Sequence, residues 1–120
     1  IAISSIAGLR GLRGAHAYTA SKHGLVGLIR GLAADFVGKP VTFNAVCPGY
    51  VDTAIIDENV ARLTARLKIS EDAARDLMLK ENPHGRLIAP EEVAAAVLHL
   101  ARPEAGSING TTLEISGGPA

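Results

Sequence analysis

The chain has 120 residues, 12 of them basic and 12 acidic, so its formal charge is zero, and no block of five or more like charges occurs. This balance argues against nucleic acid or an anionic membrane surface as the main partner and favours a small molecule or another protein. The length fits one domain at most. A single cysteine, the lack of an apolar run of about 20 residues and the lack of a visible signal peptide predict a cytoplasmic protein with no membrane span.

The chain opens on an apolar run, IAISS at 1–5, which is typical of a strand whose upstream context is missing. A glycine-rich loop, GLRGLRG at 8–14, separates it from a helical pattern over about 17–37. Gly38 can adopt the left-handed conformation that ends a helix, and Pro40 cannot continue one. The sequence therefore predicts a strand, a loop and a helix in that order.

The next segment, VTFNAVCPG at 41–49, is rich in β-forming residues and stops at Pro48-Gly49. Strand, helix and strand within about 50 residues predict a βαβ unit with parallel strands and a right-handed crossover. Ala, Leu, Val, Ile and Gly dominate the composition, as they do where helices pack closely on both faces of a parallel sheet. We expect an α/β fold.

Residues 54–82 carry two short amphipathic patterns, the second beginning after Ser70, a plausible N-cap. They predict a pair of helices that forms a flap. The segment 89–103 predicts a further helix, because Pro90 fits a first helical position, although Ala89 is a poor cap and the start could slip by a residue. TTLEIS at 111–116 predicts a last strand. No repeat or linker suggests a second domain.

One pair of side chains carries chemistry. Tyr18 and Lys22 stand four residues apart, so in a helix their side chains lie about one turn apart on the same side. A cation beside a phenol favours the phenolate and moves a tyrosine toward the range in which general acid–base catalysis works well. Taken alone the pair is weak, since this spacing usually means a half-buried ring and a solvated amine.

The surroundings of this pair favour the chemical interpretation. Ser5 ends an apolar strand shortly before Tyr18, and Pro48-Gly49 closes the next strand, so these features converge on the carboxyl ends of neighbouring parallel strands, where α/β sheets bind ligands. The motifs occur in order along the chain: ISS at 3–5, YTASK at 18–22, NAVCPGYVDT at 44–53, GRLIAPEEVA at 85–94 and INGTTLEISGG at 108–118. In these motifs the sequence resembles the short-chain dehydrogenase/reductase family.

The resemblance covers essentially the whole chain and implies a Rossmann-like, doubly wound parallel sheet. It matches only the carboxyl-terminal half of a family member. Residues 1–120 are therefore expected to be the carboxyl-terminal part of a single oxidoreductase domain, without its amino-terminal cofactor half. The implied activity is hydride transfer between NAD or NADP and a small-molecule carbonyl or alcohol.

The resemblance also implies roles for individual residues. Tyr18 would exchange a proton with the substrate oxygen, Lys22 would favour the tyrosine's ionised form and hold the nicotinamide ribose, and Ser5 would hydrogen-bond the reacting carbonyl. Further cofactor contacts would fall on the loop after the second strand, at Pro48, Gly49, Val51 and Thr53. Ser4 points to the other strand face, so its hydroxyl is expected to bond neighbouring backbone. Thr53 could also serve as a helix cap.

Some family features are absent from the sequence. The glycines at 8–14 do not have the spacing of a dinucleotide-binding turn, and the residue that would select NAD or NADP is missing. The sequence therefore leaves the cofactor type open. Two alternatives to this function also stay open. One is a non-catalytic fragment or assembly subunit, and the other is a related epimerase or dehydratase that shares the Tyr–Lys pair.

Other candidates are weaker. Cys47 lies in a buried-strand pattern, which predicts a core residue, and the four histidines show no metal-ligand spacing. Three glycines lie at helical spacing on one face, at 24, 27 and 31, where a neighbouring helix could approach closely. In the resembled family this helix forms a subunit interface, which implies a homo-oligomer, dimer or tetramer. The segment 82–94 resembles family members that act on 3-oxoacyl or polyketide-type substrates, and this resemblance implies such a substrate here.

Overall fold

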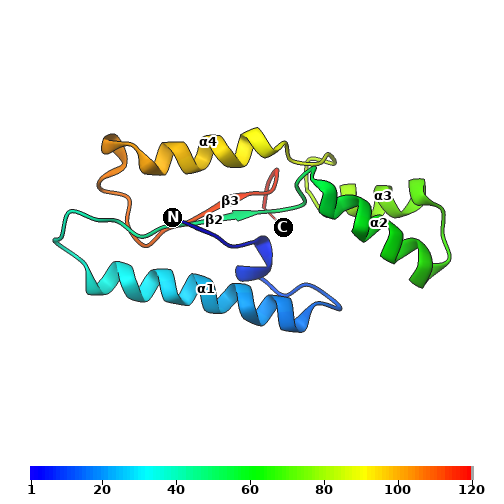
Figure 1. The fold of residues 1–120 in the computed structure, drawn as a ribbon, viewed down its shortest axis with the longest axis horizontal. Helices are drawn as coiled ribbons and strands as arrows, with labels where there is room; N and C mark the ends of the chain where they lie inside the picture. Colours follow the sequence, from blue (N-terminus) through cyan, green and yellow to red (C-terminus); the bar gives the residue numbers. More distant parts are fainter. Residues whose placement is uncertain (120) are drawn as a thin grey trace.

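A computed structural model describes residues 1–119, and it places a small parallel sheet between two long helices (Figure 1). The strands are β1 (Ala2–Ile3), β2 (Ala45–Pro48) and β3 (Thr112–Ile115), in the order β1-β2-β3, and both neighbouring pairs are parallel. The predicted α/β fold with a parallel sheet is confirmed. The strands are shorter than predicted, since residues 41–44 precede β2 as irregular chain.

The helices account for most of the ordered chain. They are η1 (Ile6–Gly8), α1 (His16–Asp35), α2 (Ala54–Leu67), α3 (Glu71–Lys80), α4 (Pro90–Ala101) and η2 (Pro103–Ala105). The helix predicted over 17–37 is α1, and Gly38 adopts the expected positive φ of 83° just beyond it. Among residues 1–119, no helix is long and apolar enough to cross a bilayer.

The two crossovers of the sheet have opposite hands. Strand order advances in one direction from β1 to β3, yet α1 and α4 lie on opposite faces of the sheet (Figure 1). With parallel strands, only one of these connections can be right-handed. If the short connection through α1 follows the usual rule, as predicted, the connection through α4 is the exception. That second connection also contains α2 and α3, so it is much longer than the connection through α1.

The core beneath α1 comes from alternation along β2. Ala45 and Cys47 pack against Val26 and Ile29 of α1, and these four side chains are buried. The other residues of β2 face the α4 side and are also buried. Because both faces are covered, β2 reads as a continuous apolar run.

Helices α2 and α3 form an arm that extends beyond the carboxyl ends of the strands (Figure 1). The arm has a buried cluster of its own, which consists of Ile56, Val60, Ala74 and Met78. Tyr50 and Leu87, from the two chain segments that join the arm to the sheet, pack on this cluster. The predicted pair of helices is therefore present, and its core continues into the loop after β2.

Side chains near the starts of α3 and α4 hold these helix ends. Ser70 Oγ accepts a hydrogen bond from Ala73 N at 3.1 Å, which confirms the predicted cap of α3. At α4 the carboxylate of Glu92 accepts from Ala89 N at 2.7 Å. This bond replaces the side-chain cap that Ala89 lacks, so α4 begins at Pro90 without the slip that the sequence left open.

Candidate active site

Lys22 and Tyr18 lie together near the start of α1, as their spacing predicts. Lys22 Nζ is 5.6 Å from the centroid of the Tyr18 ring, and it donates a hydrogen bond to Ile3 O at 3.3 Å. The Tyr18 side chain is half exposed. The ammonium therefore sits between the phenol and the end of β1, with two of its three N–H donors unused by the described residues.

The backbone of Lys22 is held as well as its side chain. Ser4 Oγ donates to Lys22 O at 3.1 Å, so the Ser4 hydroxyl bonds backbone as predicted. Gly8 makes this contact possible, because a Cβ at that position would lie 2.5 Å from Ser4 Oγ and 2.9 Å from Lys22 O. The sequence predicted a glycine-rich loop from residue 8; the structure corrects this, since Gly8 belongs to η1 and lets η1 pack directly on α1.

Ser5 follows β1, and its hydroxyl can both cap η1 and bind a substrate. Its Oγ accepts a hydrogen bond from Ala7 N at 3.0 Å, which caps η1, and the residue is almost fully buried. A hydroxyl that accepts one bond keeps its own hydrogen for donation. Ser5 can therefore cap η1 and still donate to a substrate oxygen.

The loop after β2 contains the other predicted cofactor contacts. Gly49 N donates to Ile115 O at 2.8 Å, and Val51 pairs with Ile88 in an isolated parallel bridge. Thr53 occupies the N-cap position of α2, but its side chain makes no capping hydrogen bond. The exposed Thr53 hydroxyl thus remains available to a ligand. Thr53 stands at the predicted helix-cap position, but its side chain does not cap the helix.

Tyr50 is a residue of this loop that the sequence analysis did not single out. Burial, with smaller contributions from the charges of Glu81 and Tyr18, raises the pKa of the Tyr50 phenol. The second tyrosine therefore stays neutral at ordinary pH and belongs to the same neighbourhood as Tyr18. Its position beside Gly49 in the predicted loop was the only signal in the sequence.

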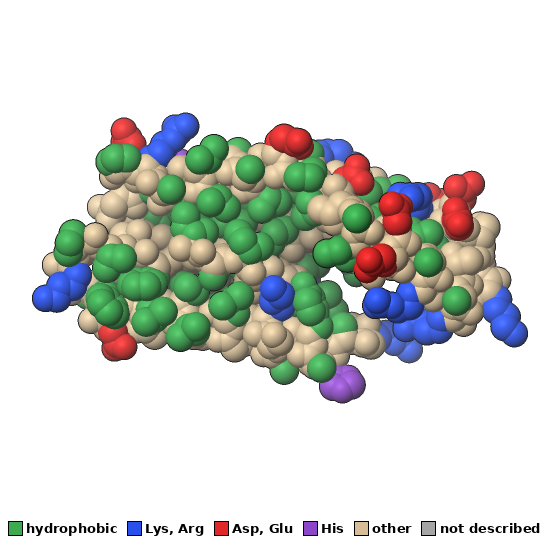
Figure 2. All heavy atoms as spheres, in the orientation of Figure 1, with side chains coloured by type: hydrophobic (Ala, Val, Ile, Leu, Met, Phe, Trp, Pro, Cys, Tyr) green, Lys and Arg blue, Asp and Glu red, His purple; other side chains and the backbone are tan. Residues whose placement is uncertain are grey.

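A hollow separates the sheet from the arm on the side shown in Figure 2. The arm leaves the body next to the start of α1 and the carboxyl ends of the strands (Figure 1). Ligands in α/β sheets bind at such ends. The hollow thus lies at the side of the molecule where Tyr18, Lys22 and the loop after β2 are found.

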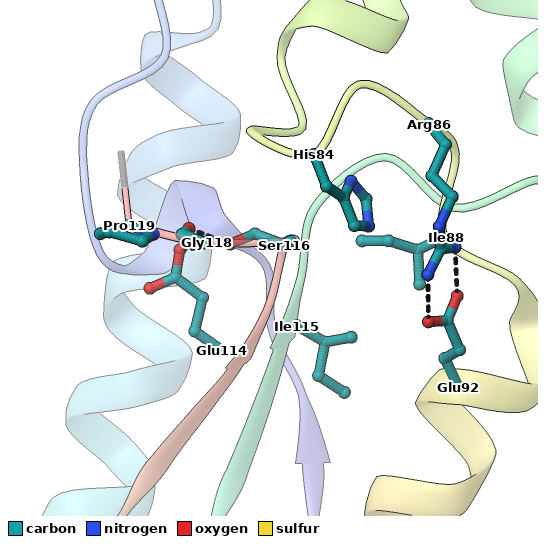
Figure 3. Close-up of a pocket in the computed structure, with 10 residues that line it drawn as sticks. His84, Arg86, Ile88, Glu92, Glu114, Ile115, Ser116, Gly118 and Pro119 are labelled. Carbon is teal, nitrogen blue, oxygen red and sulfur yellow. Dashed lines mark hydrogen bonds and ion pairs between the residues drawn. The ribbon is translucent and has the colours of Figure 1, made fainter.

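A separate pocket of about 440 Å³ lies at the end of β3 (Figure 3). Arg86 binds Glu92 there through two hydrogen bonds of 2.8 Å. The bonds from Arg86, together with the one from Ala89 N, lower the pKa of the Glu92 carboxyl to about 2. The two charges compensate each other, and none of the predicted catalytic residues lines this pocket, so we interpret it as structural.

The structure confirms one of the weaker predictions. Cys47 is buried and free, and burial raises the pKa of its thiol, as expected of a core residue. Within residues 1–119, no group of three or more metal-ligating side chains is found. Glycines 24, 27 and 31 lie on an exposed face of α1, and a Cβ added at any of them would meet nothing within 4 Å. The predicted subunit contact on this face stays a prediction.

The geometry defines a class of protein: a parallel α/β sheet with serine just beyond the end of β1 and a Tyr–Lys pair on α1. The family described as Enoyl-(Acyl carrier protein) reductase matches residues 1–119. The chain belongs to the short-chain dehydrogenase/reductase family.

Individual relatives agree with this assignment. The chain is 38% identical to an acetoacetyl-CoA reductase of Rhizobium meliloti and 39% identical to the short-chain reductase NovJ of Streptomyces niveus, over 97% and 98% of its length. It covers 44% and 43% of those two proteins. An actinorhodin polyketide ketoreductase solved with NADPH superposes with a TM-score of 0.91 at 34% identity, over 97% of this chain and 44% of that one. The chain thus spans less than half the length of these relatives.

Proposed function

We propose that the protein is an NAD(P)-dependent oxidoreductase that transfers a hydride between a nicotinamide cofactor and a carbonyl or alcohol, with Ser5, Tyr18 and Lys22 as its catalytic residues. One observation carries the proposal. The Lys22 ammonium lies beside the Tyr18 ring and bonds the last carbonyl of β1, two residues before Ser5. A cation, a phenol and a hydroxyl are therefore drawn to the carboxyl end of one strand.

Each of these side chains has a chemical task in the reduction of a carbonyl. Ser5 donates its hydroxyl hydrogen to the carbonyl oxygen and orients the substrate. Tyr18 donates its phenolic proton to the same oxygen as negative charge develops there, and the Lys22 cation stabilises the phenolate that remains. In the oxidation direction the same groups act in reverse.

The cofactor would supply or accept the hydride, and several groups of the chain fit its polar parts. Lys22 has spare N–H donors for ribose hydroxyls, and Thr53 has an exposed hydroxyl with no capping bond. Gly49, Val51 and Pro48 bring backbone close to the same end of β2. Two solved relatives, the actinorhodin polyketide ketoreductase and ElxO, hold NADPH and NADP respectively, which supports a nicotinamide dinucleotide.

The names of the relatives also support a substrate class. An acetoacetyl-CoA reductase, a putative ketoacyl reductase of granaticin biosynthesis and an actinorhodin polyketide ketoreductase are named for 3-oxoacyl or polyketide-type compounds. We extend this class to the present protein, as the segment 82–94 suggested. A cytoplasmic homo-oligomer remains part of the same proposal.

The experiment is the replacement Tyr18→Phe in the protein expressed from its native gene. The change removes the hydroxyl and keeps the ring, so turnover of a 3-oxoacyl thioester with NADPH or NADH should fall by roughly 10²–10⁴, the range of general acid catalysis. Equal rates for the Tyr18→Phe variant and the unaltered protein would refute the assignment.

The rival function, a non-catalytic fragment or assembly subunit, is tested separately. The intact mass of the native product shows whether further residues accompany these 120. Isothermal titration of that product with NADH and NADPH then measures cofactor binding directly. A native product of this size that binds neither nucleotide would favour the rival.

A further inference from the structure

Asn82 is a buried amide in the turn after α3, and its side chain bonds only backbone. Its Oδ1 accepts from Tyr50 N at 3.0 Å, while its Nδ2 donates to Tyr50 O at 2.9 Å and to Arg86 O at 2.8 Å. The residue is only 1% exposed. The Asn82 amide therefore hydrogen-bonds both the backbone N–H and the backbone carbonyl of Tyr50, as a neighbouring β-strand would. Gly49 has no side chain to obstruct this approach.

The segment on the other side of Asn82 is itself fixed. The Arg86 guanidinium binds Glu92 of α4 through two hydrogen bonds (Figure 3). Ile88 donates to Tyr50 O at 2.9 Å and accepts from Asp52 N at 2.8 Å. Asn82 thus connects the loop after β2 to a segment anchored on α4, at the point where the arm ends.

We propose that Asn82 is a positioning residue, which holds the Gly49–Thr53 loop in the shape that binds the cofactor; this role rests on the function proposed above. A loop whose peptide groups are already fixed loses less conformational freedom when a ligand binds. Asn82 does this without contacting the ligand, since all its hydrogen bonds go to protein backbone. Its removal should weaken cofactor binding more than it slows the chemical step.

The replacement Asn82→Asp gives this proposal a pH signature. A neutral carboxylic acid can accept from Tyr50 N and donate one hydrogen bond to a carbonyl, whereas a carboxylate faces two carbonyl oxygens with no hydrogen to offer. Burial disfavours the carboxylate. The variant should therefore hold the loop at low pH and release it as pH rises and the carboxyl ionises.

Asn44 provides a matched control at the opposite end of β2. It is also 1% exposed, its Nδ2 donates to Ile108 O at 2.8 Å, and its Oδ1 accepts from Thr111 N at 3.0 Å. Asn44→Asp therefore introduces the same buried charge into the same kind of amide clamp, far along the strand from the proposed cofactor loop. Any general loss of stability should appear in both variants.

The measurement is the KM for NADPH or NADH and the kcat across about pH 5 to about pH 9, the span in which a buried carboxyl can titrate, in the protein expressed from its native gene. For Asn82→Asp we expect the cofactor KM to rise about tenfold or more from the acid to the alkaline end, relative to the unaltered protein, with a much smaller change in kcat. Asn44→Asp should keep a cofactor KM that follows the unaltered protein. Asn82→Ser, which adds no charge, should raise the KM at every pH and serves if the aspartate variant does not fold.

The alternatives are separable. If both Asn82 variants lose thermal stability but bind the cofactor as the unaltered protein does, Asn82 is structural and the inference is wrong. Equal changes of KM in the Asn44 and Asn82 variants also overturn it. If the unaltered protein neither binds nor uses a nicotinamide cofactor, the proposed function has failed, and this inference fails with it.

Discussion

The contact between η1 and α1 should be intolerant of a single methyl group at Gly8. In Gly8→Ala the new Cβ would lie 2.5 Å from Ser4 Oγ, 2.9 Å from Lys22 O and 3.1 Å from Val26 Cγ2, all closer than an ordinary contact. Lys22 O belongs to a helix backbone and cannot move aside alone. Overpacking of this kind costs about 1–3 kcal/mol, and loss of the Ser4 hydrogen bond adds about 1 kcal/mol. We expect a total loss of about 2–4 kcal/mol in the free energy of unfolding.

The assay is denaturant unfolding of the protein expressed from its native gene, as a double-mutant cycle with Ser4→Ala. Ser4→Ala removes the nearest clashing atom, so the double variant should be more stable than the sum of the two single losses by about 1 kcal/mol. Gly11→Ala is the control, because a Cβ at Gly11 meets nothing within 4 Å and should change stability by less than about 0.5 kcal/mol. A Gly8→Ala variant as stable as Gly11→Ala, or a strictly additive cycle, would refute the packing argument.

Two further predictions concern the surface. The pKa of the Glu92 carboxyl is lowered from 4.5 to about 2, so the ionised carboxylate stabilises the fold above pH 4.5, and this stabilisation is lost as pH falls toward about 2. In thermal unfolding at falling pH, the melting temperature of the unaltered protein should therefore drop more steeply than that of Glu92→Gln. Gly27 faces outward with open space around it, so Gly27→Leu should shift the protein to smaller species in sedimentation if this face of α1 packs on a second copy. An unchanged distribution would show that the face is free.

The sequence by itself determined the order and kind of the main elements and the proximity of Tyr18 to Lys22. Helical spacing placed Tyr18 and Lys22 on one side of α1, and this holds because i and i+4 positions are neighbours in any α-helix. Proline and glycine marked where α1 and β2 end. The functional roles of Ser5, Tyr18 and Lys22 stay predictions until the variants are measured.

Tertiary structure alone decided which distant segments meet. The hydrogen bond from Ser4 to Lys22, next to Gly8, joins residues that are 18 positions apart in the chain. The hydrogen bonds between Asn82 and Tyr50 join residues that are 32 positions apart. No local pattern marks such contacts, because they depend on how η1 packs on α1 and on where the turn after α3 falls beside β2. The opposite hands of the two crossovers have the same origin. The face of the sheet that a helix covers follows from the whole arrangement of buried apolar surface, and periodicity within one helix does not encode it.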